Sequence, residues 1–138
     1  MNKTKMNYLI DTHIFIWSFL DSKRLNQRVS KIISDEENKI FLSSMSFWEM
    51  AIKNQSGKLN LQGINILQLP HIAKELDFEI LNPDAYDFLN IGQIPLKENH
   101  HDPFDRMLIR QAIRNNLILI SADAKFRQYE QNGLQLLW

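Results

Sequence analysis

The stretch Tyr8-Leu9-Ile10-Asp11-Thr12 places a short apolar run directly before an acid and a threonine. A similar arrangement returns near the other end of the chain, where the apolar run 117–120 precedes Ser121 and Asp123. Short runs without polar alternation are typical of strands that are buried on both faces of a parallel sheet. Ligand sites in such sheets lie at the carboxyl ends of the strands. We therefore expect Asp11 and Asp123 at one edge of the same sheet.

Strand-like and helical segments alternate between these two stretches. Further strands are expected at residues 40–42, 78–81 and 134–137, and helices at residues 13–20, 27–34, 46–55, 66–76, 83–89, 103–116 and 122–129, with Pro70 interrupting the first turn of its helix. Alternation of this kind predicts an α/β fold, here a single-domain three-layer α/β/α sandwich around a central, mainly parallel sheet.

Length and composition narrow the class of protein. The 138 residues fit one domain spanning 1–138, and because Met6 offers a second start, residues 1–5 are a candidate disordered extension. The absence of cysteine excludes disulfides and thiolate metal sites. No apolar stretch approaches the ~20 residues of a membrane span, and no signal core follows the N-terminus, so a cytoplasmic protein is expected. A formal net charge of zero argues against binding long nucleic acid by bulk charge, unless bound cations change the balance.

Two further acids lie in apolar helical stretches. Glu49 stands in the segment 47–52, which is apolar almost all round a helix and is therefore expected to be buried. Asp105 shares a helix face with Leu108, Ile109 and Ala112 by three- and four-residue spacing. A buried carboxylate costs several kcal/mol unless it is paired, hydrogen-bonded or bound to metal. Oxygen ligands without cysteine favour magnesium or manganese over zinc.

Each acid also has a purely structural interpretation. Ser46 and Glu49 have the spacing of a capping box, and Asp11 and Asp123 each suit the positive end of a helix dipole. Asp102 before Pro103 is fully explained as a helix N-cap. Four acids at helix starts and strand ends together suggest a shared metal site, although their spacing alone supports both interpretations.

Four motifs in order resemble those of PIN domains, and in particular of VapC-type toxins. They are Tyr8-Leu9-Ile10-Asp11-Thr12-His13, the segment from Ser43 to Lys53 followed by Gly57-Lys58-Leu59, the segment from His101 to Ala112, and Ile120-Ser121-Ala122-Asp123 with the closing Leu136-Leu137-Trp138. The resemblance covers nearly the whole chain.

This resemblance implies a function and a set of site residues. Asp11, Glu49, Asp105 and Asp123 match the family's acidic quartet, which holds one or two magnesium or manganese ions and cleaves RNA phosphodiesters. Thr12 matches a hydroxyl that supports the first acid, and Ser121 precedes the last. The family resemblance further implies a homodimer and a cognate antitoxin that plugs the active-site groove. Hydrolysis by water activated on metal would leave 5′-phosphate and 3′-hydroxyl ends.

Basic and aromatic residues offer candidate RNA contacts. His101, with His100 beside it, and His13 either contact phosphate or assist proton transfer, or are solvated loop residues. The stripe formed by Arg106, Arg110 and Arg114 either tracks an RNA backbone or is a solvated helix face. Lys53 and Lys58 are weaker candidates of the same kind. The aromatic residues Trp17, Phe19, Phe47 and Trp48 are expected in the core or a subunit contact rather than in base stacking.

Three rival functions follow from the same acids. A phosphohydrolase with an aspartate nucleophile usually shows two close aspartates after the first strand, whereas here only Asp11 is present. A receiver-like signalling domain would need paired acids there and an acceptor after a middle strand. A non-catalytic module that binds RNA or an antitoxin fits the sequence as well and differs only in turnover.

Overall fold

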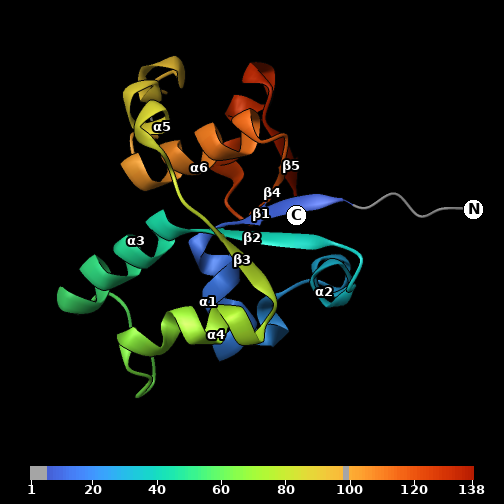
Figure 1. Cartoon of the computed structure of the whole chain (residues 1–138), viewed down its shortest axis with the longest axis vertical. Helices are drawn as coiled ribbons and strands as arrows, with labels where there is room; N and C mark the ends of the chain where they lie inside the picture. Colours follow the sequence, from blue (N-terminus) through green and yellow to red (C-terminus); the bar gives the residue numbers. More distant parts are fainter. Residues whose placement is uncertain (1–5, 98–99) are drawn as a thin grey trace, which may run out of the picture.

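The computed structural model describes residues 6–97 and 100–138, so the expected extension at residues 1–5 lies outside the described part (Figure 1). Its centre is a five-stranded, wholly parallel sheet with the strand order β3-β2-β1-β4-β5. The strands are β1 (Asn7–Ile10), β2 (Lys39–Ser43), β3 (Phe78–Leu81), β4 (Ile118–Ile120) and β5 (Gln135–Leu137). The expected strands are confirmed.

Helices cover both faces of this sheet. The α-helices are α1 (Thr12–Leu20), α2 (Gln27–Ser34), α3 (Ser44–Gln55), α4 (Leu69–Glu75), α5 (Ala85–Leu89) and α6 (Pro103–Arg114), and the 3-10 helices are η1 (Ser22–Arg24), η2 (Ile66–Gln68), η3 (Ile91–Gln93) and η4 (Ala124–Asn132). Figure 1 shows α1, α2 and α4 on one side of the sheet and α6 with the C-terminal segments on the other. The predicted three-layer α/β/α sandwich is confirmed, and no described helix is long and apolar enough to cross a membrane.

Strand β1 lies in the middle and contributes to both cores. Tyr8 and Ile10 pack into one buried cluster with Phe15 of α1, whereas Leu9 packs into the other with Leu108 of α6. Because successive side chains of a strand point to opposite faces, a central strand covered on both sides needs consecutive apolar residues. This explains the unbroken apolar run before Asp11.

Successive strands are added on one side of β1 up to β3, and on the other side of β1 from β4 onward. Segments that build β2 and β3 cross one face of the sheet, and those that build β4 and β5 cross the other, so the order reverses between β1 and β4. Ile10 pairs with both Leu42 and Ile120, which aligns the carboxyl ends of the three central strands. A crevice at this switch point is the usual ligand site of such sheets. The order also differs from the 2-1-3-4-5 order of receiver domains, so that alternative is wrong.

Three local predictions need correction. Helix α3 begins at Ser44 and is capped by Ser43, whose Oγ accepts from the Met45 amide at 3.1 Å, so Ser46 and Glu49 form no capping box. Helix α5 begins after Asp84, which forms a capping box with Asp87, and not at Pro83. Residues 124–132 form a 3-10 helix instead of an α-helix. In each case a side chain that bonds a backbone amide sets the start of the helix.

Candidate active site

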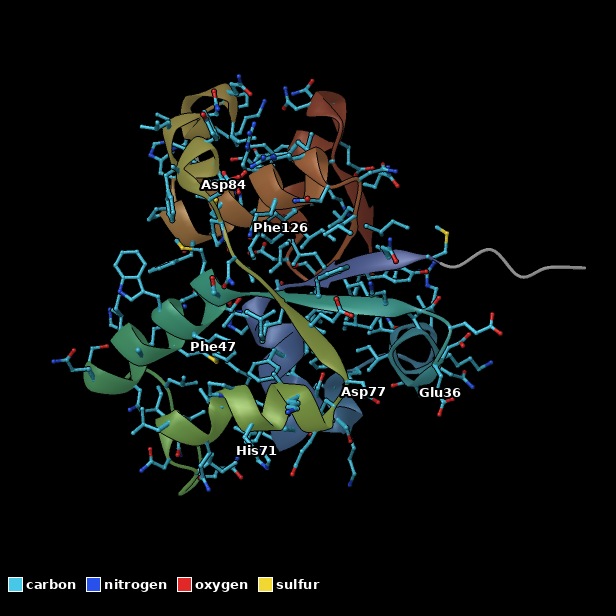
Figure 2. The ribbon with its side chains drawn as sticks, viewed as in Figure 1. Glu36, Phe47, His71, Asp77, Asp84 and Phe126 are labelled. Carbon is cyan, nitrogen blue, oxygen red and sulfur yellow. The ribbon has the colours of Figure 1, made fainter. Side chains whose placement is uncertain are left out.

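A cavity of about 300 Å³ opens at the carboxyl edge of the sheet beside β1 and β4. Its lining includes all four predicted acids, namely Asp11, Glu49, Asp105 and Asp123, together with Thr12, His13, Lys53, His100, His101, Asp102, Lys125 and Phe126. Figure 2 labels Phe126, which is buried between the sheet and the helices of the upper layer. The fold therefore gathers segments that are more than 100 residues apart in the chain (from Asp11 to Asp123) around one hollow.

Asp11 is the buried acid at the end of β1. Its side chain is the N-cap of α1 and accepts from the Ile14 amide at 2.9 Å. Burial raises the pKa of this carboxyl, while a hydrogen bond with the Ser121 side chain counteracts the rise. Ser121 is itself buried and follows β4, the neighbouring strand. The two central strands thus place a carboxylate and its hydroxyl partner side by side.

Glu49 is held on the opposite wall by partners from two helices. The Thr12 hydroxyl donates to Glu49 Oε1 at 2.6 Å, and the Ser46 Oγ lies 2.9 Å from the same hydroxyl. The Lys53 ammonium donates to Glu49 Oε2 at 2.7 Å from the next turn of α3. Both carboxylate oxygens are therefore occupied, which is how a carboxylate that is only 4% exposed stays satisfied.

Asp105 projects from the first turn of α6. Burial raises the pKa of its carboxyl to about 6, although a hydrogen bond to His100 acts in the opposite direction. The two side chains meet at 2.8 Å between His100 Nε2 and Asp105 Oδ2. Asp102 caps the same helix and accepts from the Phe104 amide at 2.8 Å, as expected from its position before Pro103.

Asp123 differs from the other three acids because it is exposed to solvent. Its side chain caps η4 by accepting from the Lys125 amide at 2.9 Å. Its own amide donates to Ser121 Oγ at 3.0 Å. The same serine thus contacts both Asp11 and the backbone of Asp123, which ties the two acids to one turn after β4.

The quartet surrounds one cavity, but as the side chains lie it is not a preformed metal cage. Within residues 6–97 and 100–138, no group of three Asp, Glu or His side chains is close enough to hold a metal ion. Each acid is instead bonded within the chain, to Ile14, Lys53, His100 or Lys125. Glu49 also stands in the middle of α3 and not at a helix start.

Helix α3 is only partly buried, contrary to the expectation of an apolar surround. Glu49 and Met50 face the interior, whereas Trp48 is 57% exposed and packs edge to face with Phe104, with 5.3 Å between ring centroids. Trp17, Phe19 and Phe47 pack partly buried against the core, as expected. Trp48 is therefore the exception in the predicted aromatic group.

The arginine stripe of α6 is bonded inside the molecule. Arg106 donates to the carbonyls of Ile91 and Ile94 at 3.0 and 2.7 Å. Arg110 bonds Asp87 and Gln93, and Arg114 bonds Asp84 and Asp87. Asp84, which is labelled in Figure 2, is the N-cap residue of α5.

This arrangement shows what the stripe does within the chain, and contact with RNA stays a prediction. The guanidinium groups of Arg106 and Arg110 fasten α5 and η3 to α6. His101 is exposed and lines the cavity, so it keeps access to a ligand.

His100 was underestimated from the sequence, where it looks like a solvated loop residue. It is 4% exposed, and its ring packs against Phe126 and Tyr129. The only signal in the sequence is its position five residues before Asp105, and that spacing does not distinguish a bonded histidine from a free one.

The fold and the site together define an α/β protein with a carboxylate-lined cavity at the switch point of a parallel sheet. A family model described as PIN domain matches residues 8–132. The chain therefore belongs to the PIN domain family, whose members are generally nucleases. This confirms the resemblance seen in the sequence motifs.

Solved structures of similar fold cover almost the whole chain. VapBC2 from Rickettsia felis bound to a promoter DNA fragment has a TM-score of 0.67 at 18% identity, with 96% of this chain and 98% of that chain covered. VapBC-1 from nontypeable Haemophilus influenzae has a TM-score of 0.67 at 22% identity, with 96% and 97% covered. FitAB bound to a DNA fragment has a TM-score of 0.57 at 18% identity, with 96% and 94% covered. No curated protein matches this chain.

Proposed function

We propose that this chain is a metal-dependent endoribonuclease and the toxin of a toxin–antitoxin pair. The observation that carries the proposal is that Asp11, Glu49, Asp105 and Asp123, from four separate segments, line one cavity at the switch point of the sheet. Membership of the PIN domain family and the cavity's position support a nuclease.

The donor set suits magnesium or manganese. All four acids offer hard oxygen ligands, and no cysteine is present to favour a softer metal. Burial raises the pKa of both Asp11 and Asp105, so their ionised forms are costly without a cation. A divalent ion would offset that cost, and Asp105 offers it Oδ1, because the bond to His100 uses Oδ2 alone. At Glu49 the ion would compete with the Lys53 ammonium for Oε2.

We assign the direct or water-mediated ligands to Asp11, Glu49 and Asp105, and a weaker second position to Asp123. Thr12 orients Glu49 by its 2.6 Å hydrogen bond, and Ser121 orients Asp11. His101 and His13 are exposed at the cavity, where they can bind a phosphate oxygen or move a proton. A bound ion would lower the pKa of water and stabilise charge on the phosphate, giving 5′-phosphate and 3′-hydroxyl products.

The partner is proposed to be an antitoxin, and the working form a cytoplasmic homodimer. The solved structures named VapBC and FitAB share this fold, and each name joins two proteins. Helix α5 also exposes Tyr86, Phe88 and Leu89 at 67%, 50% and 81% of their surface, which suits a protein contact.

The test is cleavage of total cellular RNA by the purified chain with magnesium, with manganese or with EDTA, alongside Asp11→Asn. Fragments with 5′-phosphate ends that disappear in EDTA and in the variant support the nuclease. If both proteins cleave RNA equally, Asp11 is structural. If neither cleaves RNA under any condition, the nuclease proposal is wrong. The chain is then a non-catalytic module that binds RNA or an antitoxin, and a manganese titration shows whether the acids bind metal at all.

A further inference from the structure

A second groove adjoins the acidic cavity. It has a volume of about 410 Å³ and lies between α1, η1, α3 and the turn that follows α3. Thr12, His13 and Lys53 line both hollows, so the groove continues directly from the place proposed for chemistry. A ligand that extends beyond the acidic cavity on this side must pass through it.

The groove is basic although the chain as a whole is neutral. Arg24, Lys53 and Lys58 line it, and none of its described lining residues is acidic. Within the described part of the chain, neither Arg24 nor Lys58 takes part in an ion pair. This contrasts with Arg110 and Arg114 on α6, which bond acids of α5 and its cap. Arg24 and Lys58 are therefore two cations close to the acidic cavity that no acid of the described chain neutralises.

Both cations are held at the groove by local structure. The guanidinium of Arg24 lies over the Trp17 ring, 4.4 Å from its centroid. A guanidinium stacked by its face keeps its N–H donors at the edge, where they can bind a phosphate. Lys58 follows Gly57, whose φ of +77° turns the chain, and its amide donates to the Lys53 carbonyl at 2.8 Å.

We propose that this groove is the subsite for the RNA strand next to the scissile phosphodiester, with Arg24 and Lys58 binding its phosphates. This inference rests on the proposed ribonuclease function. It adds the path of the RNA strand, which leaves the acidic cavity past Lys53. The exposed His13 ring, whose centroid lies 6.1 Å from that of Trp17, supplies an aromatic surface for a flanking base. An acidic segment of a protein partner is the competing occupant, but the exposed His13 ring beside Arg24 and Lys58 favours a nucleic acid strand.

The experiment compares the double variant Arg24→Gln, Lys58→Gln with the control Lys31→Gln, Lys74→Gln in the full chain. The control removes the same charge from exposed lysines that line neither hollow. Binding of a short fluorescent single-stranded RNA is measured by anisotropy in EDTA at several salt concentrations, and cleavage of that RNA is measured with manganese. Circular dichroism verifies that all variants fold.

Loss of two phosphate contacts should weaken RNA binding roughly 10- to 30-fold at about 0.1 M salt and reduce the salt slope by about 1.4. The effect on cleavage should fall on KM more than on kcat, and the control should match the wild type. Equal binding and KM in all three proteins overturn the subsite while leaving the nuclease intact. RNA binding that depends on Arg24 and Lys58 without any cleavage supports the subsite and removes the proposed function.

A second probe separates the two kinds of occupant. A labelled polyglutamate peptide is titrated into the same proteins. If the double variant loses peptide binding but keeps wild-type affinity for RNA, the groove serves an acidic protein and the proposal is wrong. If the wild type neither binds nor cleaves RNA, both the subsite and the nuclease are wrong.

Discussion

The Nε2 atom of His100 lies 2.8 Å from Oδ2 of Asp105, so a buried histidine and a metal-ligand candidate form one unit. The ring contacts Phe126 and Tyr129 at centroid distances of 5.3 and 5.4 Å. The Tyr129 hydroxyl also donates to the His100 carbonyl at 3.2 Å. Packing and backbone bonding therefore fix His100, and His100 in turn fixes the orientation of Asp105.

Replacing His100 should change the titration of Asp105. The substitution His100→Phe keeps an aromatic ring between Phe126 and Tyr129 but removes the hydrogen bond that lowers the pKa of Asp105. The pKa of Asp105 should rise above its value of about 6. Carboxyl NMR of the protein in EDTA measures the midpoint directly. His71→Phe, on an exposed histidine, is the control, and an unchanged midpoint in His100→Phe would contradict the role assigned to the contact.

Asp105→Asn should stabilise the metal-free protein at neutral pH. The folded-state pKa of about 6 lies above the ordinary 3.8, so the stability contributed by Asp105 is complete below about 3.8 and is lost as the pH rises through 6. At about pH 8 the variant should gain up to roughly 3 kcal/mol in free energy of unfolding, and near pH 4 it should gain nothing. Urea denaturation in EDTA at both pH values tests this. Asp77→Asn, on the surface, should show no such dependence, and a gain that is equal at both pH values would refute the burial argument.

Lys53→Met should destabilise the protein in EDTA and make it more responsive to metal. Glu49 would keep its bond from Thr12 but lose the ammonium at 2.7 Å. Because the Lys53 side chain is 38% exposed, the expected loss is only about 1–2 kcal/mol. Thermal unfolding with and without manganese should show a larger metal-induced rise in Tm for the variant than for the wild type. Lys58→Met is the matched control, and an identical metal response in all three proteins would mean that Lys53 does not compete with the ion.

Removal of the Thr12 hydroxyl should lower the free energy of unfolding. Thr12→Val preserves the shape of the side chain but removes the donor to Glu49 Oε1. A hydrogen bond to a charged group contributes about 1.5–3 kcal/mol, and a loss in that range is expected in the free energy of unfolding. Thr12→Ser retains the hydroxyl and should recover most of the stability and manganese affinity. If Ser and Val behave alike, the methyl group and not the hydroxyl is what the site needs.

Asp87 should stabilise the attachment of α5 to α6 in a pH-dependent way. Burial raises the pKa of its carboxyl, but hydrogen bonds from Arg114 and Arg110 lower it below the ordinary 3.8 overall. This stability is present above about pH 3.8 and is lost as the pH falls further. Asp87→Asn should therefore cost about 2 kcal/mol near neutral pH and less in acid. Urea denaturation near neutral pH and below pH 3.8 measures the free energy of unfolding, with Glu36→Gln as an exposed control. A cost that does not depend on pH would mean that Asp87 acts through packing alone.

Sequence patterns predicted most of the helices and strands, because the interactions that form these elements are local. Strand runs, capping residues and helix periodicity involve neighbours within about four positions, so the alternation of elements and the cap at Asp102 could be predicted. The same locality limits what these patterns can predict about contacts between distant residues. The spacing of Ser46 and Glu49 suggested a capping box with Ser46 as the N-cap. In the structure Ser43 caps α3, and Ser46 contacts Thr12, 34 residues away.

The sequence alone determined the fold class, the edge of the sheet that carries the acidic cavity and the four acids that line it. Only the tertiary structure decided which partner each charged group takes. The arginines of α6 bond α5 and η3, His100 bonds Asp105, and Arg24 stacks on Trp17 without an ion pair among the described residues. Charge pairing acts through space over a few ångströms. Arg110 and Asp87 are 23 positions apart in the sequence and come within that range only when the chain between them has folded. A periodic pattern specifies which face a side chain occupies but not which partner it will meet there.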